Sequence, residues 1–165
     1  MSSIQLTDIL APKRCVYVPE RYDTSQLFEA IAALLTPNHL KVDTSSIIAA
    51  FLAREKLAST AIGSGIALPH IRLPTITTTI GAFVRLYYSI DFASPDNKPV
   101  DLFFALLVPE KNTNAHLNTL SYLAEMFSHS DFCARLRQTE NSADLYQLLQ
   151  EKLKTPAIPA LASKR

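Results

Sequence analysis

The spacing of apolar and polar residues along the chain alternates between helical and strand periods. Apolar positions recur at helical spacing in several stretches and run almost without interruption in two others, which predicts amphipathic helices and buried strands. Thr24, Asp43 or Thr44, and Asp131 are the expected helix N-caps. The expected elements are, in chain order, a strand at 16–18, helices at 25–35 and 44–57, strands at 80–86 and 100–108, and helices at 112–128, 131–138 and 142–154. Strands flanked by helices before and after predict an α/β fold with a mixed central β-sheet and helices packed on both faces.

Residues 58–75 break the periodic pattern and contain the first candidate for chemistry, His70. Two of the chain's three glycines, Gly63 and Gly65, precede a short segment at 66–72 that we expect to be extended. Pro69 fixes its own φ and favours an extended residue before it, so His70 should sit on stiff backbone.

Alternate residues of an extended segment share a face, so His70 and Arg72 should project together. An ordinary loop histidine and a reactive one are equally compatible with this spacing.

His116 is the second candidate, because it falls in the first turn of a predicted helix and on its apolar stripe. Leu120, Leu123 and Phe127 continue that stripe. A helix N-terminus carries unpaired N–H groups and positive potential, so it favours a neutral imidazole and can bind a phosphate. From the sequence alone, a core histidine bonded to a backbone carbonyl is the favoured reading.

Arg54 is the third candidate. It follows Ile47 by seven residues and should point with the buried stripe near the C-terminal end of its helix. There it either balances the helix dipole or provides a permanently charged guanidinium for phosphoryl oxygens. His39 and His129 are expected to be surface or capping residues.

Composition narrows the class of protein. The 165 residues are 48% hydrophobic, and a formal net charge of +1 gives no basic field for nucleic acid or an anionic membrane. No apolar stretch reaches the length of a membrane helix, and the N-terminus does not resemble a signal peptide, so we expect a cytoplasmic protein. Cys15 and Cys133 are too few for a disulfide framework.

The sequence lacks the motifs of nucleotide-binding, serine-hydrolase and metal sites. The chain has no Gly-x4-Gly-Lys-[Ser/Thr] loop, and the sequence around Ser64 is not a Gly-x-Ser-x-Gly elbow. Neither His70 nor His116 has a second metal ligand at close spacing, so we expect no metal site and no cofactor.

The chain resembles the enzyme IIA domains of the bacterial phosphoenolpyruvate-dependent phosphotransferase system, in the fructose/mannitol superfamily, and within it the nitrogen-regulatory branch. The resemblance covers about residues 5–150, which suggests a domain at 1–154 and a flexible tail at 155–165. One departure is Ile71, where the family usually has a small residue after the Pro-His pair. The motifs that carry the resemblance follow one another in the order expected for the family. They are AREKLASTAIG at 53–63, GIALPH at 65–70, PVDLFFALLVPE at 99–110, HLNTL at 116–120 and FCARLR at 132–137.

The resemblance implies that His70 accepts the phosphoryl group, that His116 is a second active-site histidine, and that Arg54 helps to hold the phosphoryl oxygens. The implied donor is the phosphohistidine of an HPr-type carrier. The carrier is expected to dock against an apolar patch near His70, formed by Ile66, Leu68, Ile71 and Leu73. Further candidates for phosphate or partner contacts are Ser59, Thr60, Ser64 and Arg72.

The implied downstream role is mainly regulatory, toward targets such as potassium transport systems or sensor kinases. A sugar-specific relay to an enzyme IIB and a pure binding module that has lost transfer stay open as alternatives.

Overall fold

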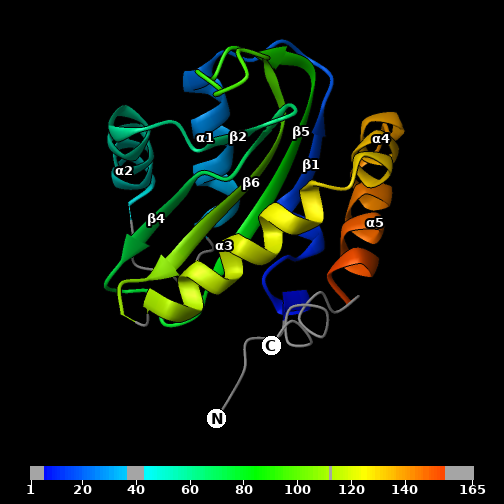
Figure 1. Cartoon of the computed structure of the whole chain (residues 1–165). Coiled ribbons are helices and arrows are strands. Elements are labelled where there is room, and N and C mark those ends of the chain that lie inside the picture. The colour runs from blue at the N-terminus through cyan, green and yellow to red at the C-terminus, as the bar shows by residue number, and fades with distance from the viewer. Residues whose placement is uncertain (1–5, 37–42, 112, 155–165) are drawn as a thin grey trace.

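The computed structural model describes residues 6–36, 43–111 and 113–154 (Figure 1). The predicted tail at 155–165 and His39 lie outside these residues. The described elements are the 3-10 turns η1 (Leu6–Asp8) and η2 (Pro12–Arg14), the strands β1 (Cys15–Val18), β2 (Ala61–Gly63), β3 (Ile66–Ala67), β4 (His70–Leu73), β5 (Ile80–Ile90) and β6 (Val100–Pro109), and the helices α1 (Thr24–Leu35), α2 (Thr44–Leu57), α3 (Thr113–Phe127), α4 (Ser130–Gln138) and α5 (Ser142–Lys154).

The strands form one mixed sheet around β6, which confirms the predicted α/β class. The strand order is β1-β5-β6-β3-β2, and β4 also pairs with β6. Strand β6 runs parallel to β3 and β4 and antiparallel to β5, while β1 runs parallel to β5.

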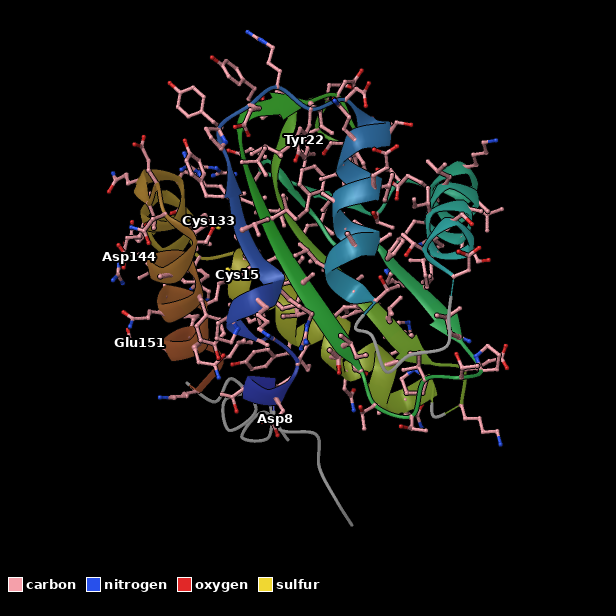
Figure 2. The ribbon with its side chains drawn as sticks, turned by 180° about the vertical axis from the view of Figure 1, so that it is seen from behind. Asp8, Cys15, Tyr22, Cys133, Asp144 and Glu151 are labelled. Atoms are coloured by element: carbon pink, nitrogen blue, oxygen red, sulfur yellow. The ribbon has the colours of Figure 1, made fainter. Side chains whose placement is uncertain are left out.

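Helices cover both faces of this sheet and divide the apolar interior into two cores. Helix α3 crosses one face in Figure 1, and α1 crosses the opposite face in Figure 2. We call the first the front core, which α3, α4 and α5 fill, and the second the back core, which α1 and α2 fill. Along β6, Leu102 and Phe104 enter the front core, whereas Phe103 and Ala105 enter the back core. This explains why the strand reads as a nearly continuous apolar run.

Two helix N-caps differ from the residues predicted from the sequence. Helix α1 is capped by Asp23 rather than Thr24: the Gln26 N–H donates to Oδ1 of Asp23 at 2.8 Å, and the Gln26 side chain accepts the Asp23 N–H at 2.9 Å. This reciprocal pair satisfies two backbone donors, so Asp23 is favoured over the threonine that follows it. Helix α4 begins at Ser130 with His129 at the N-cap, and Asp131 falls in its first turn.

Strand β5 is longer than predicted and extends to Ile90. Its register with β6 shifts between Arg85 and Ile90, where exposed residues replace the apolar run that marked the predicted strand. Within the described parts of the chain, no helix has the length and apolar character needed to cross a membrane.

Candidate functional site

Strand β4 places His70 on the face of the sheet that α3 covers. Both β3 and β4 pair with β6 in one register, with Ile66 opposite Leu102 and His70 opposite Leu106. Pro69 interrupts the strand between them, because it has no N–H to donate. Its carbonyl instead accepts the Leu106 N–H at 2.8 Å, so the backbone before His70 stays attached to β6.

The imidazole of His70 is oriented by the backbone two residues earlier. Its Nδ1 lies 2.8 Å from the carbonyl oxygen of Leu68. A carbonyl can only accept a hydrogen bond, so Nδ1 carries the proton and Nε2 of the neutral ring keeps its lone pair. The half-buried ring is therefore held in the tautomer whose Nε2 can act as a nucleophile.

The first turn of α3 brings His116 against His70. The two ring centroids are 5.3 Å apart and the ring planes are inclined at 53°. Residue His116 is only 5% exposed, and its Nδ1 has no hydrogen-bond partner among the described residues. His116 also lies on the predicted stripe, since Leu123 and Phe127 of the same helix are buried in the front core.

Two guanidinium groups act on this histidine pair. Arg72 lies two residues along β4 from His70 and is exposed, and its charge lowers the pKa of both histidines. Arg54 is half-buried near the end of α2, donates from Nη1 to the Ala58 carbonyl at 2.8 Å, and lowers the pKa of His70. The guanidinium of Arg54 therefore combines the dipole-balancing role with a position that acts on His70.

Burial is the main cause of the lowered pKa of each histidine. Desolvation disfavours the imidazolium of His70, and the charges of Arg54 and Arg72 add to this, while the hydrogen bond to Leu68 opposes it. Desolvation is also the largest cause of the lowered pKa of His116, and the charges of His70 and Arg72 lower this pKa further. Both rings are thereby favoured as neutral imidazoles beside fixed positive charge.

The hydroxyl groups predicted to contact phosphate are used within the fold. Ser59 Oγ donates to the Phe92 carbonyl at 2.8 Å, and Thr60 Oγ1 donates to Oε1 of Glu55 at 2.8 Å. Ser64 lies in the β2–β3 turn beside the start of β6, whereas His70 pairs farther along that strand. The structure therefore does not bring Ser64 to the histidine pair.

The expected docking patch around His70 is wrong for three of its four residues. Ile66 and Leu68 are buried in the front core and Ile71 in the back core, whereas Leu73 is half-buried against the back core. Exposed apolar residues lie close in sequence to Arg54 and His116: Leu57, 83% exposed at the end of α2, and Leu117, 54% exposed beside His116.

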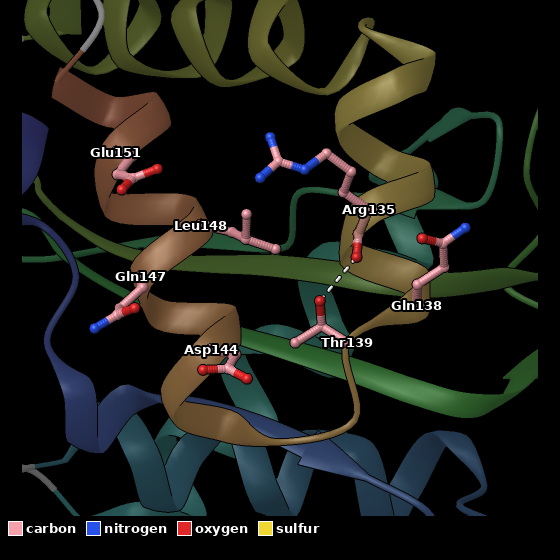
Figure 3. A pocket seen from close by; sticks show the side chains of 7 residues that line it. All are labelled: Arg135, Gln138, Thr139, Asp144, Gln147, Leu148 and Glu151. Atoms are coloured by element: carbon pink, nitrogen blue, oxygen red, sulfur yellow. Dashed lines mark hydrogen bonds between the residues drawn. The ribbon is translucent and has the colours of Figure 1, made fainter.

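The structure also contains a polar groove away from the histidines. It has a volume of about 480 Å³ and lies between α4 and α5, where Arg135 of α4 faces Leu148 and Glu151 of α5 (Figure 3). Helix α5 packs beside β1, and β4 lies at the opposite edge of the sheet (Figure 1). In the described residues, no group of three or more His, Cys, Asp or Glu side chains could hold a metal ion.

Sequence reasoning did not single out the polar contacts that fix the loops around the site. Glu55 binds Thr60 through both carboxylate oxygens, and Arg137 of α4 binds Asp101 with Nε at 2.9 Å and Nη2 at 2.9 Å. Glu55 and Arg137 lie within the motif segments of the chain, but nothing in their local spacing indicates which partner they meet.

The sequence profile of the family described as "Phosphoenolpyruvate-dependent sugar phosphotransferase system, EIIA 2" matches residues 9–152. The chain is 37% identical over 151 residues to a nitrogen regulatory protein of Klebsiella oxytoca, covering 91% of this chain and 93% of that protein. A fructose-specific EIIA component of Haloferax volcanii is 34% identical over 109 residues, covering 66% of this chain and 71% of that protein.

A crystal structure of the nitrogen regulatory protein IIA-Ntr from Neisseria meningitidis superimposes with a TM-score of 0.79 at 34% identity. The match covers 87% of this chain and 98% of that one. The similarity therefore extends over nearly the whole of both proteins and includes the strands and helices that carry the histidine pair.

Proposed function

The chain belongs to the enzyme IIA family of the phosphoenolpyruvate-dependent phosphotransferase system, and from this premise we propose that Nε2 of His70 accepts a phosphoryl group from an HPr-type carrier. One observation carries the proposal: the Leu68 carbonyl holds the proton of His70 on Nδ1, beside a second buried histidine and two arginines. A neutral imidazole nitrogen with a lone pair is a competent nucleophile near neutral pH.

The transfer exchanges one phosphorus–nitrogen bond for another. The lone pair of Nε2 attacks the phosphorus of the carrier's phosphohistidine, and the carrier imidazole leaves with the electron pair of the broken bond. His70 keeps its Nδ1 proton, which the Leu68 carbonyl continues to accept. The ring becomes more positive as the new bond forms, and this carbonyl stabilises that charge.

Fixed positive potential then stabilises the phosphoryl oxygens. The loose transition state of phosphoryl transfer spreads negative charge over three oxygens, which cations and oriented dipoles stabilise. Arg54 and the N-terminal end of α3 beside His116 would provide this potential, and Arg72 adds a charge on the same face of β4.

The phosphorylated protein would act mainly as a regulator in the cytoplasm. Similarity to nitrogen regulatory proteins over about nine tenths of the chain supports this role. Phosphorylation adds about two negative charges to a site that carries two arginines, so partner proteins can distinguish the two forms by charge. The proposed partners are the carrier and regulatory targets of the potassium transport or sensor kinase type.

Phosphoryl acceptance can be tested with radiolabelled phosphorylated carrier. We expect acid-labile, alkali-stable label on the wild-type protein, since phosphohistidine has this stability. His70→Ala should abolish labelling because the nucleophile is gone. His116→Ala should slow labelling but not prevent it, because the acceptor nitrogen is still present.

Normal labelling of His70→Ala would overturn the assignment of the acceptor. Absence of label on the folded wild-type protein, with an active carrier, would overturn the proposed function itself.

A sugar-specific relay is the second candidate, supported by the similarity to a fructose-specific EIIA component. It requires the labelled protein to pass its phosphoryl group to an enzyme IIB. Fast loss of label to a fructose-type or mannitol-type IIB would favour the relay. Stable label, together with a target protein that binds only one phosphorylation state, would favour the regulator.

A further inference from the structure

The hydrogen bond that selects the His70 tautomer depends on the position of one carbonyl, that of Leu68. The two peptides around it are fixed from both sides of the strand. The Pro69 carbonyl accepts the Leu106 N–H from β6 at 2.8 Å, and the Leu68 N–H donates to the Thr60 carbonyl at 3.0 Å. The Thr60 peptide therefore helps to determine where the Leu68 carbonyl points.

Thr60 is in turn held by a single carboxylate. Its N–H donates to Oε2 of Glu55 at 2.7 Å, and its hydroxyl donates to Oε1 of the same residue at 2.8 Å. Thr60 is only 6% exposed, so water competes poorly for these two donors. Both oxygens of one carboxylate thus fix both the backbone and the side chain of Thr60 in a single arrangement.

These contacts form a continuous chain from helix α2 to the reactive ring. Glu55 lies in the last turns of α2, next to Arg54, and it fixes Thr60 just after that helix ends. Thr60 fixes Leu68, and Leu68 fixes Nδ1 of His70. Each residue is held by the previous one through a hydrogen bond of 3.0 Å or less, and none of these four contacts involves Nε2, where a carrier would approach.

We propose that Glu55 and Thr60 are positioning residues for His70: through the Leu68 carbonyl they keep the proton on Nδ1 and aim Nε2 at the incoming phosphorus. This inference rests on the proposed function for its effect on rate, whereas its effect on the imidazole is independent of that function. It also gives the Thr60 hydroxyl a role other than the direct phosphate contact suggested by the sequence.

The physical consequence is a pre-organised nucleophile. Phosphoryl transfer requires attack in line with the leaving nitrogen, so a ring free to rotate or to exchange tautomers spends part of its time unable to react. Removing the Glu55 carboxylate leaves two buried donors on Thr60 unsatisfied, and the peptide must shift to find other acceptors. The Leu68 carbonyl would then no longer be held at one distance from Nδ1.

The first measurement is nitrogen NMR of the His70 ring in the unphosphorylated full chain, above the pKa of the histidine. In the wild-type protein, we expect a protonated Nδ1 and an unprotonated Nε2. Glu55→Ala and Thr60→Val should give a mixture of tautomers. Thr60→Ser should restore the wild-type signal, because serine keeps the hydroxyl.

The second measurement is the rate of phosphoryl transfer from the carrier. Glu55→Ala should lower that rate about tenfold, as expected for losing hydrogen bonds to a charged group. Thr60→Ser should retain most of the wild-type rate. Glu29→Ala is the matched control, since it removes an exposed glutamate from α1 without touching Thr60.

The outcomes separate this inference from the function on which it rests. If the wild-type protein accepts phosphate but Glu55→Ala and Thr60→Val keep both the tautomer and the rate, the positioning role is wrong. If the tautomer changes as expected but no protein is labelled, the positioning chain is real and the proposed function is wrong. Circular dichroism on each variant shows whether a lost rate follows from a lost fold.

Discussion

At the scale of single residues, the site depends on keeping an imidazole neutral close to positive charge. Burial lowers the pKa of His70 and His116, and the arginines lower it further. Protonation of these rings is therefore shifted below the ordinary histidine value of about 6.5. Between the lowered pKa and that value, the unfolded chain binds more protons than the folded one, so the free energy of unfolding falls as the pH falls through this window.

The rate of phosphoryl acceptance should follow the same titration. We expect the wild-type rate to stay constant as the pH falls to about 6.5 and to drop only below it, because the neutral ring of His70 is the proposed nucleophile. In Arg72→Ala, the acid limb of the pH–rate profile should move to higher pH, since removal of a nearby positive charge lets the pKa of His70 rise.

Arg135→Ala is the control for this measurement, because it removes the same charge from α4, which lies at the opposite edge of the sheet from β4. An acid limb that stays in place in Arg72→Ala, or moves equally in both variants, would contradict the assigned electrostatics.

At the scale of elements, the turn between β2 and β3 shows how side chains from distant segments hold a short hairpin. Gly63, Ser64 and Gly65 all have positive φ, at +95°, +58° and +81°. The Ser64 N–H donates to Oδ2 of Asp96, and the Ser64 carbonyl accepts from Nη2 of Arg137. The hairpin leading to β3 is therefore fixed by contacts with α4 and with the loop before β6.

A substitution at Gly65 should destabilise the protein more than the same substitution at Gly63. Gly65→Ala would place a Cβ 2.5 Å from Nη2 of Arg137 and 2.9 Å from Oδ1 of Asp101, in addition to the strain of positive φ. At Gly63 the nearest atom, Oδ2 of Asp96, is 3.4 Å away, so only the strain applies.

We expect a loss of about 1–3 kcal/mol in the free energy of unfolding for Gly63→Ala and a larger loss for Gly65→Ala, measured by urea denaturation. Equal losses would mean that the contact between the hairpin and Arg137 adjusts at no cost.

At the scale of the whole molecule, the sheet separates two aromatic cores. Phe28 and Phe51 stack in the back core with ring centroids 5.6 Å apart. Phe127 packs in the front core against Phe83, with ring centroids 6.1 Å apart. Side chains within one core should therefore be energetically coupled, whereas those on opposite faces should not.

Double-mutant cycles can measure this separation. Phe28→Leu combined with Phe51→Leu should show a coupling of about 0.5–1.5 kcal/mol, typical of an aromatic pair. Phe28→Leu combined with Phe127→Leu should be additive within about 0.5 kcal/mol. Thermal or urea unfolding of the wild-type protein, the three single variants and the two double variants provides the energies, and strong coupling across the sheet would contradict two separate cores.

The sequence predicted the features that depend on local periodicity. The apolar run at 100–108 became β6, and the stripe through His116, Leu123 and Phe127 became the buried side of α3. The alternation after Pro69 placed His70 and Arg72 on the same face of β4. Apolar spacing predicts these elements because the residues that face a core recur with the period of the helix or strand that carries them.

The features that depend on contacts between distant residues were missed or misjudged. The apolar residues around His70 were expected to form a docking patch, since nothing local indicates that Ile66, Leu68 and Ile71 enter the two cores. The hydroxyls of Ser59 and Thr60 were assigned to phosphate, because their partners, the Phe92 carbonyl and Glu55, are known only once the chain is folded. The pairing of His70 with His116 was expected only through the family resemblance.

The uniform pairing of β3 and β4 with β6 sets a strict limit on how the gene can change in length. Loss or gain of one codon between Ala67 and His70 would invert the facing of every later side chain in β4, since strand neighbours alternate. The imidazole would then be turned toward α1 and α2, away from His116. A comparable change in the loop at 94–99 would lengthen or shorten a connection and leave the imidazole of His70 where it is.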